Sequence, residues 1–255
     1  MFHSIFNKIF KSEIFQFVPI ILLCFLLIDN KKNLSVNNLI NPYVKNINYS
    51  QIVKINNFNG FEKLHQGALS KDFMLCYAGS LKSHQSAEVL WQAMESVALQ
   101  MPSFTQHAKV HMFGQTDPHL ENKVPRSVTE MIVWQGYQAK SVVDKALASA
   151  RVLLFFGNDH PYSEQVINAK IFEYMAAGRP VLALVHSHGD LSAFIQKHTL
   201  GAVFLYSEKD KITHWLHKQY VAFSEGKPPE NSLVDFTYSR KNLTSQLEKL
   251  LTQNT

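Results

Sequence analysis

The sequence has only two cysteines among its 255 residues, Cys24 and Cys76, and this scarcity argues against a fold stabilised by disulfides. Cys24 lies within an apolar run, and Cys76 lies within a predicted strand. Because no disulfide framework is expected, the reducing cytoplasm is the expected compartment.

The sequence also lacks a concentration of charge of either sign. Its formal net charge is +5, its pI is near 9.0, and its lysines and arginines are scattered along the chain. A surface that binds nucleic acid is therefore not expected. A modestly basic surface suits an anionic nucleotide or an acidic membrane leaflet.

A comfortable membrane-spanning run is absent as well, since about 20 apolar residues are needed to cross a bilayer as a helix. Residues 14–28 are apolar apart from Gln16, and Pro19 would kink any long helix there. No small-residue cleavage site follows, so a transmembrane helix and a cleaved signal peptide both fit imperfectly. An interfacial anchor, a marginal membrane helix, a buried element and a remnant of other sequence are the alternatives.

The chain does contain enough apolar material for a globular core. Hydrophobic residues make up 46% of it and charged residues 18%, as in folded proteins. Residues 1–51 combine the apolar segment with a linker rich in asparagine and lysine, and residues 52–255 are predicted to hold the folded domain.

Strand and helix patterns alternate from residue 73 to residue 223. The predicted strands are 73–78, 109–113, 131–134, 150–156, 181–185 and 201–205. The predicted helices are 86–100, 141–149 with Ser141 as its cap, one that ends at Gly178, 190–197, 210–223 and 240–251, and a short helix is expected within 116–129. This alternation predicts an α/β fold, a Rossmann-like parallel sheet with helices on both faces.

Residues 170–184 are the centre of this pattern. Their first half has helical spacing and stops at Gly178 and Pro180, and their second half is an apolar strand. Together with the preceding strand they form a βαβ unit. Residues 157–169, which include Asn168, therefore lie at the carboxyl end of a strand, where open α/β sheets bind ligands.

Lys170 and Glu173 bring charged groups to that edge. Lys170 falls in the first turn of the helix, where free N–H groups and the macrodipole favour an anion and an ammonium can contact a phosphate. Glu173 follows one turn later and can accept hydrogen bonds from a vicinal diol such as a ribose. An ion pair between the two on a solvated helix face is the alternative explanation of their spacing.

Glycine-containing turns end other strands at the same predicted edge. The turn at residues 79–85 begins with Gly79, which lets backbone amides approach a phosphate, and Ser80 and Lys82 can add donors. The predicted strand at 131–134 is closed by another such turn, which contains Gly136. A crevice of nucleotide size along this edge is the resulting hypothesis.

A metal site is not expected, although the sequence has 12 histidines. His186, His188 and Asp190 follow a strand and have the residue types of metal ligands. We expect the histidines of this loop to be solvent-exposed instead. Arg179, in the turn before the next strand, is expected to have a structural or solvated role rather than a catalytic one.

Five segments together resemble a known family. They are CYAGSL at 76–81, FG at 113–114, WQGY at 134–137, ARV at 150–152 and KIFEYMAAGRPVLA at 170–183. These segments are similar to the carboxyl-terminal, donor-binding domain of GT-B glycosyltransferases, especially bacterial enzymes of the glycosyltransferase 4-like group that build surface polysaccharides. The resemblance covers roughly residues 52–251.

The resemblance implies that this domain binds a nucleotide-diphosphate sugar as substrate, with no metal or other cofactor. Glu173 matches the acid that the family associates with ribose hydroxyls, and Lys170 matches a lysine common in the subgroup. Asn168, just ahead of both, is placed with the donor-binding residues. The family's first acid falls at Gln165, which is not an acid here, although Glu164 is adjacent.

The glycine turns also match parts of the family's donor site. Gly79, Ser80 and Lys82 match the turn that faces the diphosphate. Gly136 and Tyr137 match the turn that lines the base. No catalytic residue can be assigned, because in the family the groups nearest the reacting acceptor come largely from a separate amino-terminal domain.

That acceptor domain, of about 150 residues or more, would precede residue 52, where the sequence shows only an apolar segment and a linker. The expected function is therefore sugar transfer from a nucleotide-diphosphate sugar to a surface-polysaccharide or lipid-linked acceptor, with a second chain as partner supplying the acceptor domain. The alternatives are a non-catalytic nucleotide-sugar-binding module and an inactive truncated remnant. The expected location is the cytoplasm, at the inner face of the membrane if residues 14–28 associate with it.

Overall fold

The computed structural model describes residues 68–158, 163, 166–230 and 236–252. The apolar segment at 14–28, the linker and the predicted domain start at residue 52 lie outside these ranges. Within the described ranges, no helix is both long enough and apolar enough to cross a membrane.

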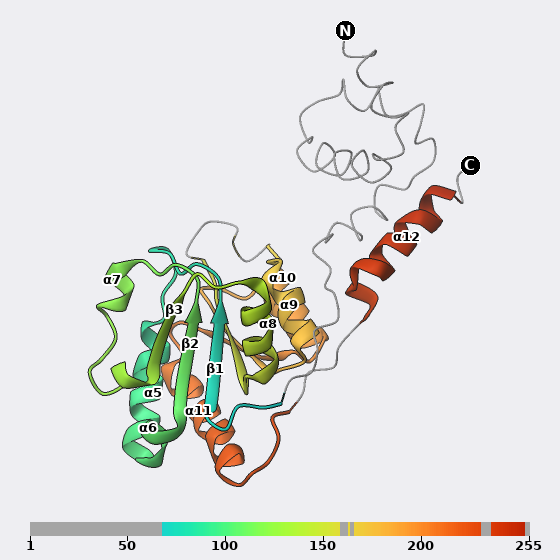
Figure 1. Cartoon of the computed structure of the whole chain (residues 1–255). Helices are drawn as coiled ribbons and strands as arrows, with labels where there is room; N and C mark the ends of the chain where they lie inside the picture. Colours follow the sequence, from blue (N-terminus) through green and yellow to red (C-terminus); the bar gives the residue numbers. More distant parts are fainter. Residues whose placement is uncertain (1–67, 159–162, 164–165, 231–235, 253–255) are drawn as a thin grey trace. The chain divides into compact units, whose positions relative to one another are not determined.

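Six strands form one sheet in the spatial order β3-β2-β1-β4-β5-β6 (Figure 1). They are β1 (Phe73–Ala78), β2 (Ala108–Phe113), β3 (Ile132–Gly136), β4 (Val152–Phe156), β5 (Val181–Val185) and β6 (Gly201–Leu205). Every neighbouring pair is parallel. This is the order of a Rossmann sheet, so the predicted fold class is confirmed.

Helices cover both faces of the sheet (Figure 1). One face carries the buried side chains of α5 (Glu88–Gln100), α6 (Ser103–His107), α7 (Pro118–Glu121) and α11 (Lys209–Ser224). The other carries those of α8 (Lys140–Ser149), α9 (Lys170–Ala177) and α10 (Asp190–Lys197). Because parallel neighbours require crossover connections, the chain passes from one end of the sheet to the other through these helices.

The burial of the strands explains their apolar sequences. Strands β1, β4 and β5 are buried along their whole length, between the two helical layers. Strand β6 lies at an edge and is only partly buried. The uninterrupted apolar runs of the central strands are therefore the sequence signal of a sheet covered on both faces.

The predicted end of α9 is confirmed. Gly178 adopts the left-handed conformation, with φ of 64°, and its N–H donates to the carbonyl of Met175 at 3.1 Å. A residue with a Cβ would be strained in this conformation, which is why helices often stop at glycine. Separately, α12 (Arg240–Thr252) is a helix of 13 residues, as expected for 240–251.

Two local predictions are wrong. Ser141 does not cap α8, because the helix already begins at Lys140 and Ala139 occupies the cap position without a side-chain hydrogen bond. Met131 ends a short 3-10 helix, so the strand begins only at Ile132. Helix α6 was not predicted, because its five residues are too few to show a helical period.

Candidate functional site

The carboxyl ends of β1 and β4 form the switch point of the sheet. The chain leaves β1 through α5 toward β2, and it leaves β4 through α9 toward β5 on the opposite side. Loops that diverge in this way leave a crevice, and open parallel sheets bind ligands there. The turns after β1 and β4 are therefore the first places to seek binding groups.

The hydroxyl of Tyr174 joins these two strands where their direct pairing has ended. It donates to the carbonyl of Leu154 at 2.9 Å and accepts the N–H of Ala78 at 3.1 Å. Burial raises the pKa of this hydroxyl well above its ordinary value, so it stays a protonated donor. Sequence reasoning treated Tyr174 only as an apolar helix residue. The missed signal was that a buried tyrosine needs a hydrogen-bond partner.

Two glycines bring the turns after β1 and β2 together. Gly79 has φ of +140°, and a Cβ there would lie 2.5 Å from Nζ of Lys170. Gly114 has φ of +105°, and a Cβ there would lie 2.5 Å from the carbonyl oxygen of Gly79. Both contacts are too short for a real side chain. The missing Cβ at Gly79 therefore lets the ammonium of Lys170 rest against the turn, and the missing Cβ at Gly114 lets the two turns approach each other.

Ser80 presents two unused hydrogen-bond donors at this turn. Its carbonyl accepts the hydroxyl of Tyr77 at 3.0 Å, which fixes the peptide. Within the part of the chain that the structure describes, neither the N–H nor the hydroxyl of Ser80 donates a hydrogen bond, and the residue is exposed. A free amide and a free hydroxyl beside a glycine can bind an anion.

Gln85 holds the same turn against β4. Its side-chain amide donates to the carbonyl of Phe156 at 2.9 Å, and its side-chain carbonyl accepts the N–H of Lys82 at 3.1 Å. The turn is thus tied to both strands of the switch point. Sequence reasoning missed Gln85, because a glutamine in a polar loop carries no periodic signal.

Lys170 is a cation without a carboxylate partner among the described residues. Its Nζ lies 4.0 Å from the ring centroid of Tyr77 and 5.9 Å from that of Phe155. Burial lowers the pKa of Lys170 to about 8, and the charge of Glu173 offsets only part of this effect. A desolvated ammonium that faces aromatic rings gains from an incoming anion, which would pair with it.

The start of α9 is capped from within the chain. The side-chain oxygen of Asn168 accepts the N–H of Lys170 at 3.0 Å. The carbonyls of Asn168 and Ala169 accept the next two N–H groups, each at 3.1 Å. The expectation that these amides are free to bind an anion is therefore wrong. The ammonium of Lys170 is the group that this helix end offers, and the side chain of Asn168 satisfies the first helical N–H from the position before the cap residue Ala169.

Glu173 forms an ion pair, but not with Lys170. Its carboxylate lies 3.3 Å from Nζ of Lys140, the first residue of α8, and that ammonium also lies 2.7 Å from Asp144. The two lysines therefore have different surroundings: Lys140 pairs with carboxylates, whereas Lys170 packs on aromatic rings. The ion pair between Lys170 and Glu173 that the spacing suggested is absent from the described residues.

A cleft of about 500 Å³ opens at the carboxyl ends of β1, β2 and β3. It brings together Gly79, Ser80, Gly136 and Tyr137 from the predicted site. Tyr137 is 93% exposed. The rest of the lining is Ala78, Phe113, Gly114, Gln115, Gln138 and Val143.

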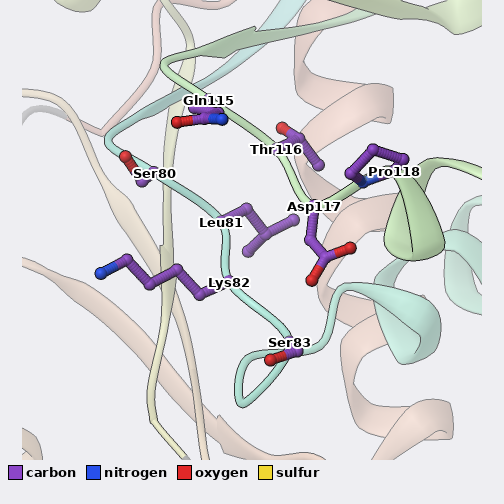
Figure 2. Close-up of a pocket in the computed structure, with 8 residues that line it drawn as sticks. All are labelled: Ser80, Leu81, Lys82, Ser83, Gln115, Thr116, Asp117 and Pro118. Atoms are coloured by element: carbon purple, nitrogen blue, oxygen red, sulfur yellow. The ribbon is translucent and has the colours of Figure 1, made fainter.

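A second cleft, of about 460 Å³, shares Ser80 and Gln115 with the first. Figure 2 shows its lining, in which the side chain of Lys82 extends away from Asp117. Lys82 lines only this second cleft. The structure therefore divides the predicted residues between two adjoining clefts, while Lys170 reaches Gly79 from α9 and Asn168 and Glu173 line neither.

Within the described ranges, no group of three or more His, Cys, Asp or Glu side chains could hold a metal ion. The ring of His186 packs on Tyr206, with centroids 4.4 Å apart. The guanidinium of Arg179 donates twice to the carbonyl of Ala148, at 3.0 and 2.7 Å, as a structural role requires. Glu164 and Gln165 lie outside the described residues.

Comparison with known families identifies one match, the model of glycosyl transferases group 1, over residues 72–217. The matched range contains all the strands of the sheet and both clefts. No curated protein matches the chain.

Several solved structures share the fold. The Anabaena Alr3699/HepE structure in complex with UDP is 13% identical with a TM-score of 0.54, and the match covers 80% of this chain and 51% of that one. The pneumococcal O-GlcNAc transferase GtfA in complex with UDP and GlcNAc is 15% identical with a TM-score of 0.51, covering 76% and 38%. The GtfA/B complex is 16% identical with a TM-score of 0.54, again covering 76% and 38%.

At these identities the likeness shows the fold alone, that of one half of a GT-B glycosyltransferase. The chain spans about half or less of the length of the structures that it matches.

Proposed function

The chain belongs to the group 1 glycosyl transferases, and we propose that its Rossmann-like domain binds the nucleotide-diphosphate-sugar donor of a sugar-transfer reaction. One observation carries this proposal: the ammonium of Lys170, which no described carboxylate pairs, and the Ser80 donors, which no described group accepts, meet at Gly79 at the switch point of the sheet. Charge-assisted hydrogen bonds from such groups complement a diphosphate.

The ribose and the base of the donor are proposed to lie along the first cleft, the one of about 500 Å³. From Ser80 it extends to Gly136 and Tyr137, where the exposed ring offers a stacking face to a base. The ribose would lie between base and diphosphate, and Glu173 is the carboxylate proposed to accept its hydroxyls. The helix that carries the ion-pair partner of Glu173 also contributes Val143 to the cleft.

UDP is the nucleotide to test first. The HepE and GtfA structures, which share the fold, are both described in complex with UDP. The bound UDP belongs to those proteins. For this chain it makes uracil the first base to test, and guanine, tested as GDP, the second.

In the proposed reaction, the bond between the sugar C1 and the diphosphate oxygen breaks, and a bond forms between C1 and an acceptor hydroxyl oxygen. The hydroxyl proton passes to a base on the acceptor side of the reaction, to which no described residue is assigned. Negative charge grows on the departing diphosphate. Lys170 and the N–H of Ser80 would stabilise that charge, and the proposal needs no metal.

We propose a surface-polysaccharide or lipid-linked acceptor, bound by a partner chain or by residues outside the described ranges. The GtfA/B structure is a complex, which supports a two-chain arrangement. A non-catalytic nucleotide-sugar-binding module is the second candidate, because all the groups described here lie on the donor side. Movement of the sugar from the bound donor onto an acceptor, when an acceptor-binding chain is added, would distinguish transfer from binding alone.

Calorimetric titration of the full chain with UDP, GDP, uridine and UDP-glucose tests the proposal. We expect UDP to bind, and Lys170→Met to weaken UDP about tenfold while leaving uridine unchanged, since only UDP carries the diphosphate. Lys218→Met, an exposed lysine on α11, is the control and should bind as wild type does. A folded protein that binds no nucleotide, or a Lys170→Met variant with unchanged UDP affinity, would contradict the proposal.

A further inference from the structure

Lys140 connects the two helices that border the site. As the first residue of α8, it follows the turn after β3, and one turn later the same helix contributes Val143 to the larger cleft. Its ammonium lies 3.3 Å from the carboxylate of Glu173 on α9 and 2.7 Å from that of Asp144. A single side chain thus bridges α8 and α9 beside the cleft.

The charge of Lys140 is already matched by two carboxylates, and this separates it from Lys170. Hydrogen bonding and attraction from Asp144 and Glu173 outweigh the effect of partial burial and raise the pKa of Lys140 above its ordinary value. It therefore stays charged and paired throughout the neutral range. An ammonium held in this way is a poor ligand for a phosphate, so a direct diphosphate contact is not its role.

The ion pair between Lys140 and Glu173 is not explained by a contribution to the stability of the fold. The side chains of Lys140 and Glu173 are 64% and 41% exposed, and ion pairs between exposed groups contribute little to stability. The geometric effect is more specific. Glu173 has no other hydrogen bond or ion pair among the described residues, so Lys140 is the described group that sets the direction of its carboxylate.

We propose that Lys140 is a positioning residue for the ribose of the donor, holding the carboxylate of Glu173 in the orientation that accepts the ribose hydroxyls. The inference rests on the proposed function. Fixing the carboxylate in advance removes the entropy that would otherwise be lost when the ribose binds. Asp144, one helical turn from Lys140, anchors the ammonium from its other side.

The ratio of the dissociation constants of 2′-deoxyuridine diphosphate and UDP isolates this effect, because the two ligands differ only in one ribose hydroxyl. We expect wild type to prefer UDP by about tenfold, as for a hydrogen bond to a charged group. In Lys140→Met, the ratio should fall toward one through weaker UDP binding, with deoxyuridine diphosphate little changed. Lys140→Arg, which can reach both carboxylates, should retain the wild-type ratio.

Lys145→Met provides the matched control, since Lys145 is exposed on the same helix and the substitution removes the same charge. It should retain the wild-type ratio. Equal weakening of both ligands by Lys140→Met would show a general structural or electrostatic role and would overturn the inference. A wild type that binds UDP without preferring it over the deoxy compound would overturn the inference alone, whereas a wild type that binds neither would overturn the proposed function as well.

Discussion

Lys170 combines partial burial with the lack of a carboxylate partner among the described residues, and this combination should reduce stability. Burial lowers its pKa to about 8 from an ordinary 10.5, so below pH 8 the folded state holds a disfavoured charge. Lys170→Met should therefore raise the free energy of unfolding at pH 7 by roughly 1–3 kcal/mol. Urea denaturation measures the difference. A variant less stable than wild type would show that the contact with Tyr77 outweighs the desolvation of the charge.

The same residue predicts how nucleotide binding depends on pH. An anionic ligand binds the charged form of Lys170, and the free protein loses that proton as the pH rises through about 8. The affinity for UDP should change little from pH 7 to pH 8 and then fall toward a plateau about tenfold lower, the affinity expected once Lys170 is uncharged. Lys170→Met should show no such fall. A wild-type affinity that is constant to pH 10 would exclude Lys170 from the phosphate site.

Gly79→Ala should damage the site more than its small change in size suggests. The new Cβ would lie 2.5 Å from Nζ of Lys170, at a φ of +140° that side chains rarely adopt. We expect a loss of roughly 1–3 kcal/mol in stability and weaker UDP binding. Gly226→Ala is the control, because Gly226 also has positive φ, +71°, but has open space around it. Its UDP affinity should stay that of wild type, and an equal loss in both variants would assign the effect to backbone strain alone.

At the level of secondary structure, Tyr174 connects α9 to both strands of the switch point. Tyr174→Phe would leave the N–H of Ala78 and the carbonyl of Leu154 without their partner, which should cost roughly 2–4 kcal/mol in the free energy of unfolding. Tyr220→Phe should cost less, because both partners of its hydroxyl, Ser103 and His107, are exposed to water. Denaturation of both variants provides the comparison. A loss for Tyr174→Phe no larger than that of the control would show that the strands do not depend on this hydroxyl.

The elements could be predicted from sequence where burial leaves a continuous pattern. The bounds of β1, β5, β6 and α10 agree with the predicted ranges, because uninterrupted apolar runs or helical spacing meet turn residues at both ends. Helix α6 was not predicted, since a helix of five residues is too short to show a helical period. The start of α8 was misplaced, because the helix begins at Lys140 without a side-chain cap, whereas the prediction relied on Ser141 as the cap.

The spacing of residues along the sequence could not predict which side chains contact each other between different helices and strands. Glu173 and Lys170 lie one helical turn apart and suggested an ion pair, but the partner of Glu173 is Lys140 on another helix. The hydrogen bond from Gln85 to Phe156 spans 71 positions and depends on the sheet order. Local spacing predicts which side chains share a helix face, whereas the partner across the crevice depends on how the helices pack.

For the domain as a whole, the strand order decides where the site can lie. Alternating strands and helices predicted a parallel sheet, and the Rossmann order then brings the ends of β1 and β4 together. Lys82 lines the smaller cleft, and Lys170 contacts the turn at Gly79. The larger cleft is lined by four of the predicted residues, Gly79, Ser80, Gly136 and Tyr137. The binding roles of these residues remain predictions, which ligand measurements must test.

The most direct measurement is the change in backbone amide chemical shifts of the isotopically labelled full chain when UDP is added. The account predicts the largest changes at Gly79, Ser80 and Gly136, and little change along α11, on one face of the sheet. Changes confined to Thr116 and Asp117 would place the ligand in the smaller cleft instead. Saturating UDP that leaves the amides of Gly79 and Ser80 unmoved would contradict the claim that the switch point is the donor site.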